Sequence, residues 1–201
     1  RGFSKDFLIH GFTVKPGQEK NSYEQFQNIC SEMDVTTEKV RNAYDLSRKQ
    51  KELIVSAESS FNEYEQSVAN IVDAQRAKDN AFAVWSKLGG AVTSDIQNAM
   101  NTVIIPNREA AEETKDFEEL KKWSDITAGV DEKVVAPFFL LRVYGTYLVA
   151  TGSEDIWKKF TGQLAKVKDG LAEWTQTVQG ESQLETLAAD LKSYFQEYEQ
   201  A

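Results

Sequence analysis

The amino-acid sequence predicts an all-α protein: an elongated antiparallel helical bundle or coiled coil with long heptad helices and a short extended N-terminal arm. Three prolines and eleven glycines among 201 residues are too few turn residues for a sandwich or barrel of many short strands. Residues 18–88 contain neither glycine nor proline, and their apolar side chains recur at alternating spacings of three and four. A seven-residue repeat held over this length is typical of a left-handed coiled coil.

The N-terminal arm is predicted over residues 1–17, where apolar residues such as Phe7 and Phe12 alternate loosely and a turn signal follows at Pro16. We expect this arm either to pair as a short strand with another chain or to lay its aromatic side chains on the helices. Residues 18–201 are predicted to form a single helical-bundle domain.

The first heptad seam starts at Phe26 and keeps its phase to Trp85. One interruption is expected at residues 34–38, where a threonine can cap a new helix, and Gly89-Gly90 is expected to end the helix. The seam predicts packing against another helix of the chain or against a second copy. Its expected assembly residues are Ile54, Phe61, Tyr64, Val68, Ile71, Phe82 and Trp85.

Later segments repeat this pattern. A kinked or restarted helix is expected at Pro106, because proline lacks an N–H and its ring collides with the preceding turn. A second heptad seam runs from Trp157 to Val178, and a further apolar series runs from Leu184 to Tyr198 after a break at Gly180. These seams predict helices that pack on one another.

Residues 134–150 form the most apolar stretch of the chain. The stretch is short for a membrane span, and Arg142 lies in its middle, where a charge costs about 2.5–3.5 kcal/mol on insertion. We therefore expect the buried central helix of a bundle. The alternative is a membrane-inserting element of a helical pore-former.

Charge and residue types exclude several classes of function. The net charge of −9 argues against nucleic acid as a partner, because the phosphate backbone is also negative. The single histidine, His10, rules out a histidine-based zinc site or catalytic triad, and no glycine-rich phosphate loop is present. We therefore expect no enzyme activity, no cofactor and no metal. The single cysteine, Cys30, excludes an intramolecular disulfide and leaves the redox compartment open, with a reducing one favoured. The sequence leaves the location of the protein open, and a cytoplasmic or peripheral-membrane location is the expectation.

One basic cluster stands out in this acidic chain. Its residues share or adjoin one face of the first long helix, so they are candidates for contact with anionic lipid or an acidic partner. Neighbouring acidic residues offer the other interpretation, which is ordinary surface ion pairing. The cluster consists of Arg41, Arg48, Lys49 and Lys51.

Two local stretches carry a family resemblance. Residues 102–106 form an apolar run that ends at a proline and precedes an acidic segment, and residues 133–139 are followed by two tyrosines. With the long heptad helices, these stretches resemble the BAR-domain superfamily of dimeric, membrane-curving coiled coils. The resemblance implies a dimer that contacts membranes through basic residues, and the basic cluster is the part of this sequence that matches.

The sequence therefore predicts a non-enzymatic, self-associating helical scaffold or interaction module. The expected partner is a protein, with a second copy of this chain first in order, and a BAR-like contact with an anionic membrane surface is a further expectation. The alternative function is that of an α-helical pore-forming or cell-surface protein that uses residues 134–150.

Overall fold

Helix is the regular secondary structure of the residues that the structure describes, and no strand occurs among them. These residues are 7, 10–43 and 45–201 of a computed structural model of the chain. The all-α prediction and the prediction of long helices are confirmed.

Contacts divide the chain into two compact units, Arg1–Ala77 and Lys78–Ala201. The long helix α3 (Arg48–Ala99) contributes its first part to one unit and its remainder to the other. The prediction of a single domain over residues 18–201 stays a prediction.

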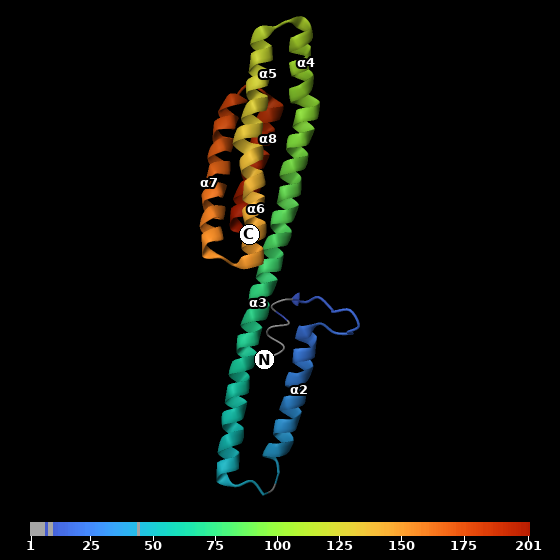
Figure 1. Cartoon of the computed structure of the whole chain (residues 1–201), viewed down its shortest axis with the longest axis vertical. Coiled ribbons are helices and arrows are strands. Elements are labelled where there is room, and N and C mark those ends of the chain that lie inside the picture. The colour runs from blue at the N-terminus through green and yellow to red at the C-terminus, as the bar shows by residue number, and fades with distance from the viewer. Residues whose placement is uncertain (1–6, 8–9, 44) are drawn as a thin grey trace. The chain divides into compact units, whose positions relative to one another are not determined.

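The first unit contains a helical hairpin, in which α2 (Ser22–Arg41) lies beside the first part of α3 (Figure 1). Asn21 begins α2 with a reciprocal cap. Its side chain accepts a hydrogen bond from the Glu24 N–H at 3.0 Å, and the Glu24 carboxylate accepts one from the Asn21 N–H at 2.9 Å. The cap satisfies backbone donors that the first helical turn leaves open.

The predicted interruption at residues 34–38 is wrong, because α2 continues through it. The Thr36 hydroxyl donates to the Glu32 carbonyl at 2.8 Å, so it bonds back to its own helix and caps no new one. The helix instead ends at Arg41, and the described residues before Arg48 include Asn42, Asp45 and Ser47, residue types that favour turns.

The hairpin is held by ring contacts and by a small core. The rings of Phe26 and Tyr64 meet edge to face, with their centroids 5.7 Å apart. An ion pair joins Arg41 on α2 to Glu58 on α3. The buried core residues of this unit are Phe7, Phe26, Cys30, Val68 and Val72.

The N-terminal arm contributes an aromatic side chain to that core. Phe7 is fully buried, and its ring meets the Phe12 ring edge to face at 5.2 Å. Phe7 and His10 have helical backbone conformations, so the extended conformation predicted for the arm is wrong at these positions. The buried aromatic rings hold this part of the arm in the core of the unit. This agrees with the second expected arrangement, in which the arm lays its aromatic side chains on the helices. Residues 1–6 and 8–9 of the predicted arm lie outside the described residues.

The second unit begins within α3, which continues through Gly89-Gly90, so the predicted helix end there is wrong. A Cβ added to Gly89 would lie 3.1 Å from the Arg142 Nε, so this glycine allows close packing of two helices. The later elements are η1 (Met100–Ile104), α4 (Ile105–Thr114), α5 (Phe117–Gly129), η2 (Val130–Val135), α6 (Ala136–Thr151), α7 (Glu154–Thr177) and α8 (Ser182–Gln200), where η denotes a π-helix.

Both π-helical segments precede a proline in the first turn of the next α-helix, Pro106 in α4 and Pro137 in α6. Proline has no N–H to donate and its ring needs space in the preceding turn, and the wider π turn provides that space. Polar side chains bond the carbonyls nearby. The Asn107 Nδ2 donates to the Val103 carbonyl at 2.7 Å, and the Gln163 Nε2 donates to the Pro137 carbonyl at 2.9 Å.

Helix α7 makes a very close backbone contact with η2. A Cβ added to Gly170 would lie 2.0 Å from the carbonyl oxygen of Lys133. That carbonyl is four residues before Pro137, which has no N–H to donate to it. Only glycine leaves room for this approach.

Tryptophan side chains connect the helices of the second unit. The Trp174 Nε1 donates to the Ile126 carbonyl at 3.2 Å, which joins α7 to α5. The Trp85 Nε1 donates to the Tyr198 carbonyl at 3.0 Å, which joins α3 to α8. The Trp85 ring also stacks on the rings of Phe160 and Tyr198, with centroids 4.9 and 5.4 Å away.

The apolar series predicted for the last two helices lie largely in this core. The buried apolar residues of α7 and α8, with Val178 after α7, are Phe160, Leu164, Val167, Leu171, Trp174, Val178, Leu184, Leu187, Ala188, Leu191, Phe195 and Tyr198. Trp157, at the start of the predicted seam, is instead 49% exposed. Gly180 lies between the helices with a φ of +91°, a conformation that glycine adopts without strain.

We predict that Gly170→Ala destabilises the protein and that Gly162→Ala stabilises it. The added methyl group at Gly170 collides with the Lys133 carbonyl and costs at least about 2 kcal/mol of the free energy of unfolding. Gly162, also on α7, has open space around its Cα, so alanine there adds about 1 kcal/mol through helix propensity. Urea unfolding followed by circular dichroism measures both changes. Equal stabilities would contradict the contact between α7 and η2.

Alkaline pH is predicted to weaken the second unit through Tyr198. Burial raises the pKa of Tyr198 to about 12, against roughly 10 for an unfolded tyrosine, while nearby Arg142 lowers it. The unfolded chain therefore loses this proton first as the pH rises. Between pH 10 and 12 the free energy of unfolding falls by about 1.4 kcal/mol per pH unit from this residue.

Tyr198→Phe removes the titrating hydroxyl, so we expect the free energy of unfolding of this variant to fall less over the same pH range. The substitution leaves the Tyr198 backbone carbonyl in place for Trp85. Urea unfolding at several pH values between 9 and about 12 compares the two proteins. Parallel curves would show that the Tyr198 hydroxyl does not titrate differently in the folded state.

Candidate interaction surface

Helix α6 presents apolar side chains on two opposite sides. One side contributes Phe138, Leu141 and Gly145 to the core. The other side carries four large apolar residues, spaced so that they form one stripe along the helix. This stripe, the α6 row, consists of Phe139, Leu140, Val143 and Tyr147, which are 52%, 42%, 46% and 57% exposed.

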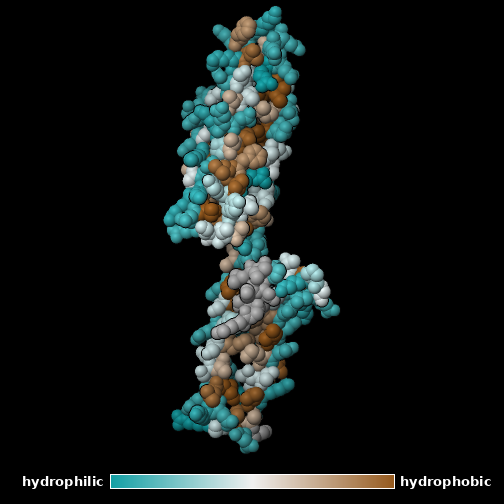
Figure 2. Space-filling view, in the orientation of Figure 1, coloured by the Kyte–Doolittle hydropathy of each residue, from teal (hydrophilic) through white to brown (hydrophobic). Residues whose placement is uncertain are grey.

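The α6 row carries no charge. Figure 2 shows apolar residues gathered on the face of the second unit that lies over α6. Arg142 is the charged residue within α6, and it is partly buried, with its guanidinium group packed near Gly89 of α3. The exposed stripe is therefore available to an apolar partner at little electrostatic cost. Contiguous apolar patches of this kind mark sites of contact with proteins or membranes.

A groove adjoins the α6 row on the side of α3 and η1. It encloses about 270 Å³, and Phe139 belongs both to its wall and to the row. Its floor is apolar, and a few polar side chains lie at its edge. The apolar lining consists of Val92, Ile96, Met100, Ile105, Val135, Phe138 and Phe139, and the polar lining consists of Thr93, Gln97, Asn101 and Asp131.

The prediction of a buried central helix over residues 134–150 is wrong for this exposed side. Arg142 and the core residues of α6 face inward or lie partly covered, while the α6 row faces solvent. By length and composition alone, the described residues include one helical stretch, within Phe117–Thr151, apolar enough to cross a membrane, and 22% of its apolar window is buried.

The predicted assembly seam is divided between the two units, and two of its seven residues are buried within the chain. Val68 is buried in the hairpin, and Trp85 is buried in the second unit. The remaining seam residues are half-buried or exposed: Ile54, Phe61, Tyr64, Ile71 and Phe82. Their role in assembly stays a prediction, because α2 already covers part of the seam on α3.

The prediction that the four residues of the basic cluster lie on one helix is wrong, because Arg41 ends α2 whereas Arg48, Lys49 and Lys51 begin α3. Arg41 pairs with Glu58, and Arg48 pairs with Glu52 at 2.9 Å. Within the described part of the chain, Lys49 and Lys51 form no ion pair. Exposed apolar residues lie nearby, among them Val40, Leu53 and Val55.

Few ionisable groups among the described residues have a pKa that departs clearly from its ordinary value. Burial, with a hydrogen bond and charge repulsion from Glu65, raises the pKa of Cys30 to about 12, so its thiol stays protonated at neutral pH. A hydrogen bond from Tyr194 to Asp95, 3.0 Å long, raises the pKa of Tyr194. No group of three or more potential metal-binding side chains occurs among the described residues.

Comparisons with protein families, with curated proteins and with solved structures find no match for this chain. The α6 row, the groove beside it and the basic cluster are therefore the features on which a proposal of function rests.

Proposed function

We propose that the chain is a non-enzymatic helical scaffold that associates with a second copy of itself through the α6 row. The observation that carries the proposal is the uncharged, solvent-exposed stripe of large apolar residues from Phe139 to Tyr147. In this proposal the helices of the second unit form an antiparallel bundle, and the bundle presents α6 to the partner.

Apolar burial supplies the driving force in this proposal. Each square ångström of apolar surface removed from water contributes about 25 cal/mol. Residues 139, 143 and 147 recur every four positions, so two copies of α6 packed against each other can place each large side chain between two of the partner. A two-fold axis lets the same stripe serve on both copies, which makes a second copy the simplest partner.

Val143→Glu is expected to convert the dimer to a monomer. The glutamate places a charge at the centre of the apolar contact, so the dissociation constant rises at least about 100-fold. Multi-angle light scattering over a concentration series gives the mass. Circular dichroism should be unchanged, because Val143 is exposed on the folded chain.

Leu53→Glu is the matched control. Leu53 is also an exposed aliphatic residue on a helix, at 61%, but it belongs to the first unit. Its variant should dimerise as the parent chain does. A monomeric parent chain at high micromolar concentration, or an unchanged mass for Val143→Glu, would contradict the proposal.

A second candidate function is contact with an anionic membrane surface through the basic cluster, as the BAR resemblance implies. It is supported by Lys49 and Lys51, which form no ion pair within the described residues, and by exposed Leu53 and Val55 beside them. Each lysine near an anionic surface contributes about 1 kcal/mol, and salt weakens the attraction.

Sedimentation with phosphatidylserine vesicles tests this second function. Lys49→Glu/Lys51→Glu should weaken binding at least about 30-fold, and high salt should abolish binding by the parent chain. The control, Lys159→Glu/Lys166→Glu, makes the same change of charge on exposed positions of α7. Equal binding by both variants would exclude the basic cluster. Binding to neutral vesicles with dye release would instead support the pore-forming alternative for residues 134–150.

A further inference from the structure

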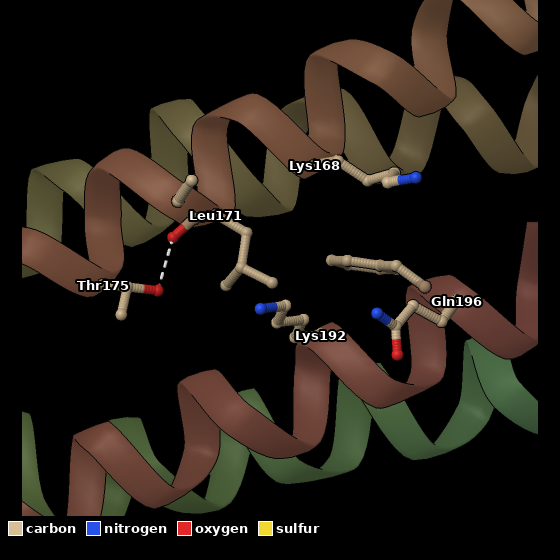
Figure 3. Close-up of a pocket in the computed structure, with 7 residues that line it drawn as sticks. Lys168, Leu171, Thr175, Lys192 and Gln196 are labelled. Atoms are coloured by element: carbon tan, nitrogen blue, oxygen red, sulfur yellow. Dashed lines mark hydrogen bonds between the residues drawn. The ribbon is translucent and has the colours of Figure 1, made fainter.

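A second apolar groove lies between α7 and α8, away from the α6 row (Figure 3). It encloses about 310 Å³, which is within the range of small-molecule sites. Leu171 and Phe195 line it and also belong to the core, so the groove reaches down to the core itself. Polar and charged side chains lie around its mouth, and these are Lys168, Thr175, Lys192 and Gln196.

The polar side chain at one end turns away from the groove. The Thr175 hydroxyl donates to the Leu171 carbonyl at 2.7 Å, as Figure 3 shows, so it bonds its own helix. The neighbouring Ala172 is small and leaves the space between the helices open. The interior of the groove is therefore apolar and offers a surface for a hydrocarbon chain.

The mouth of the groove carries positive charge in a protein whose net charge is −9. Lys192 extends from α8 toward Leu171 on α7 in Figure 3, and within the described residues it forms no ion pair. Lys168 pairs with Glu199 at 2.8 Å. Lys192 is thus the cation that is available to an anionic ligand, and Gln196, one turn further along α8, also lines the groove.

A second hollow of about 410 Å³ continues along the same two helices and shares Lys168 with the groove. Leu164, Phe160 and Trp157 line this hollow. It also contains the carboxylates of Asp169 and Glu199. Asp169 and Glu199 therefore lie beside Lys168, near the junction with the groove, and Trp157, close to the start of α7, lies at the far end of this hollow.

We propose that the α7–α8 groove binds a single-chain fatty carboxylate. The carboxylate lies at Lys192, where it gains a charge-assisted hydrogen bond. The hydrocarbon chain rests on Leu171 and extends past Lys168 toward Trp157. The opposite orientation is disfavoured, because it would place the carboxylate beside Trp157 and Phe160. Among the residues that line this hollow, the only lysine is Lys168, and it pairs with Glu199. This site shares no residue with the α6 row and does not depend on self-association.

Quenching of tryptophan fluorescence by brominated hexadecanoate tests both the site and its orientation. Bromine near the terminal methyl group should quench more strongly than bromine beside the carboxylate, because the tail ends near Trp157. The tail also lies near Trp85, which stacks on Phe160 of the same hollow, so Trp157→Phe should reduce the difference without removing it. Equal quenching by the two positions, or an undiminished difference in Trp157→Phe, would overturn the orientation and with it the proposal.

Affinity measurements test the role of the charge. Hexadecanoate should bind at least ten-fold more tightly than its neutral methyl ester, and Lys192→Met should abolish this preference. Lys166→Met is the control, because it removes an exposed lysine from α7 that does not line the groove. Ala172→Trp should block binding of both ligands by filling the groove.

Equal affinities for the acid and the ester, or an unchanged preference in Lys192→Met, would overturn the proposal. An absence of binding by hexadecanoate at its solubility limit would do the same. None of these outcomes bears on the mass of the protein, so failure of this proposal and failure of self-association remain distinguishable.

Discussion

The close approach of Gly170 to the Lys133 carbonyl is the contact on which the second unit depends. It brings the backbone of α7 against η2, at a point where Pro137 has no N–H for that carbonyl. With this spacing, Gln163 reaches the Pro137 carbonyl and Trp174 reaches the Ile126 carbonyl. The buried face of α7, and therefore its exposed groove with α8, follow from this one backbone contact.

The π turn before α6 also decides which of its apolar residues are buried. Ile126, Val130, Val134 and Phe138 are all buried and follow one another at intervals of four. In an α-helix each such step passes a full turn by about 40°, so three steps would rotate the stripe away from the core. The wider turn of η2 offsets this drift. Phe138 consequently points into the core, and its neighbour Phe139 starts the exposed row.

Local sequence patterns predicted the helices but not their partners. The heptad spacing from Phe26 to Trp85 indicated helix correctly except between Arg41 and Arg48, and the same spacing suits packing on α2 or on a second copy. The link between α2 and α3 contains neither glycine nor proline, so no strong turn signal marks it, and Gly89-Gly90 is indistinguishable in sequence from a helix end. Contacts between residues that are far apart in the sequence determine where these helices end and which partner each one packs against.

The candidate sites also differ in how far the sequence predicts them. The nearness of the basic residues to one another was predictable, because they are close in sequence, but their division between α2 and α3 was not. The α6 row could not be predicted from the sequence, because a helix that is apolar on all sides does not indicate which side faces solvent. The α7–α8 groove joins Leu171 to Lys192 across a loop whose path depends on Gly180. Finally, α3 serves both compact units. Starting a helix is far less favourable than lengthening one, so whichever unit orders first supplies the nucleus from which the helix of the other grows.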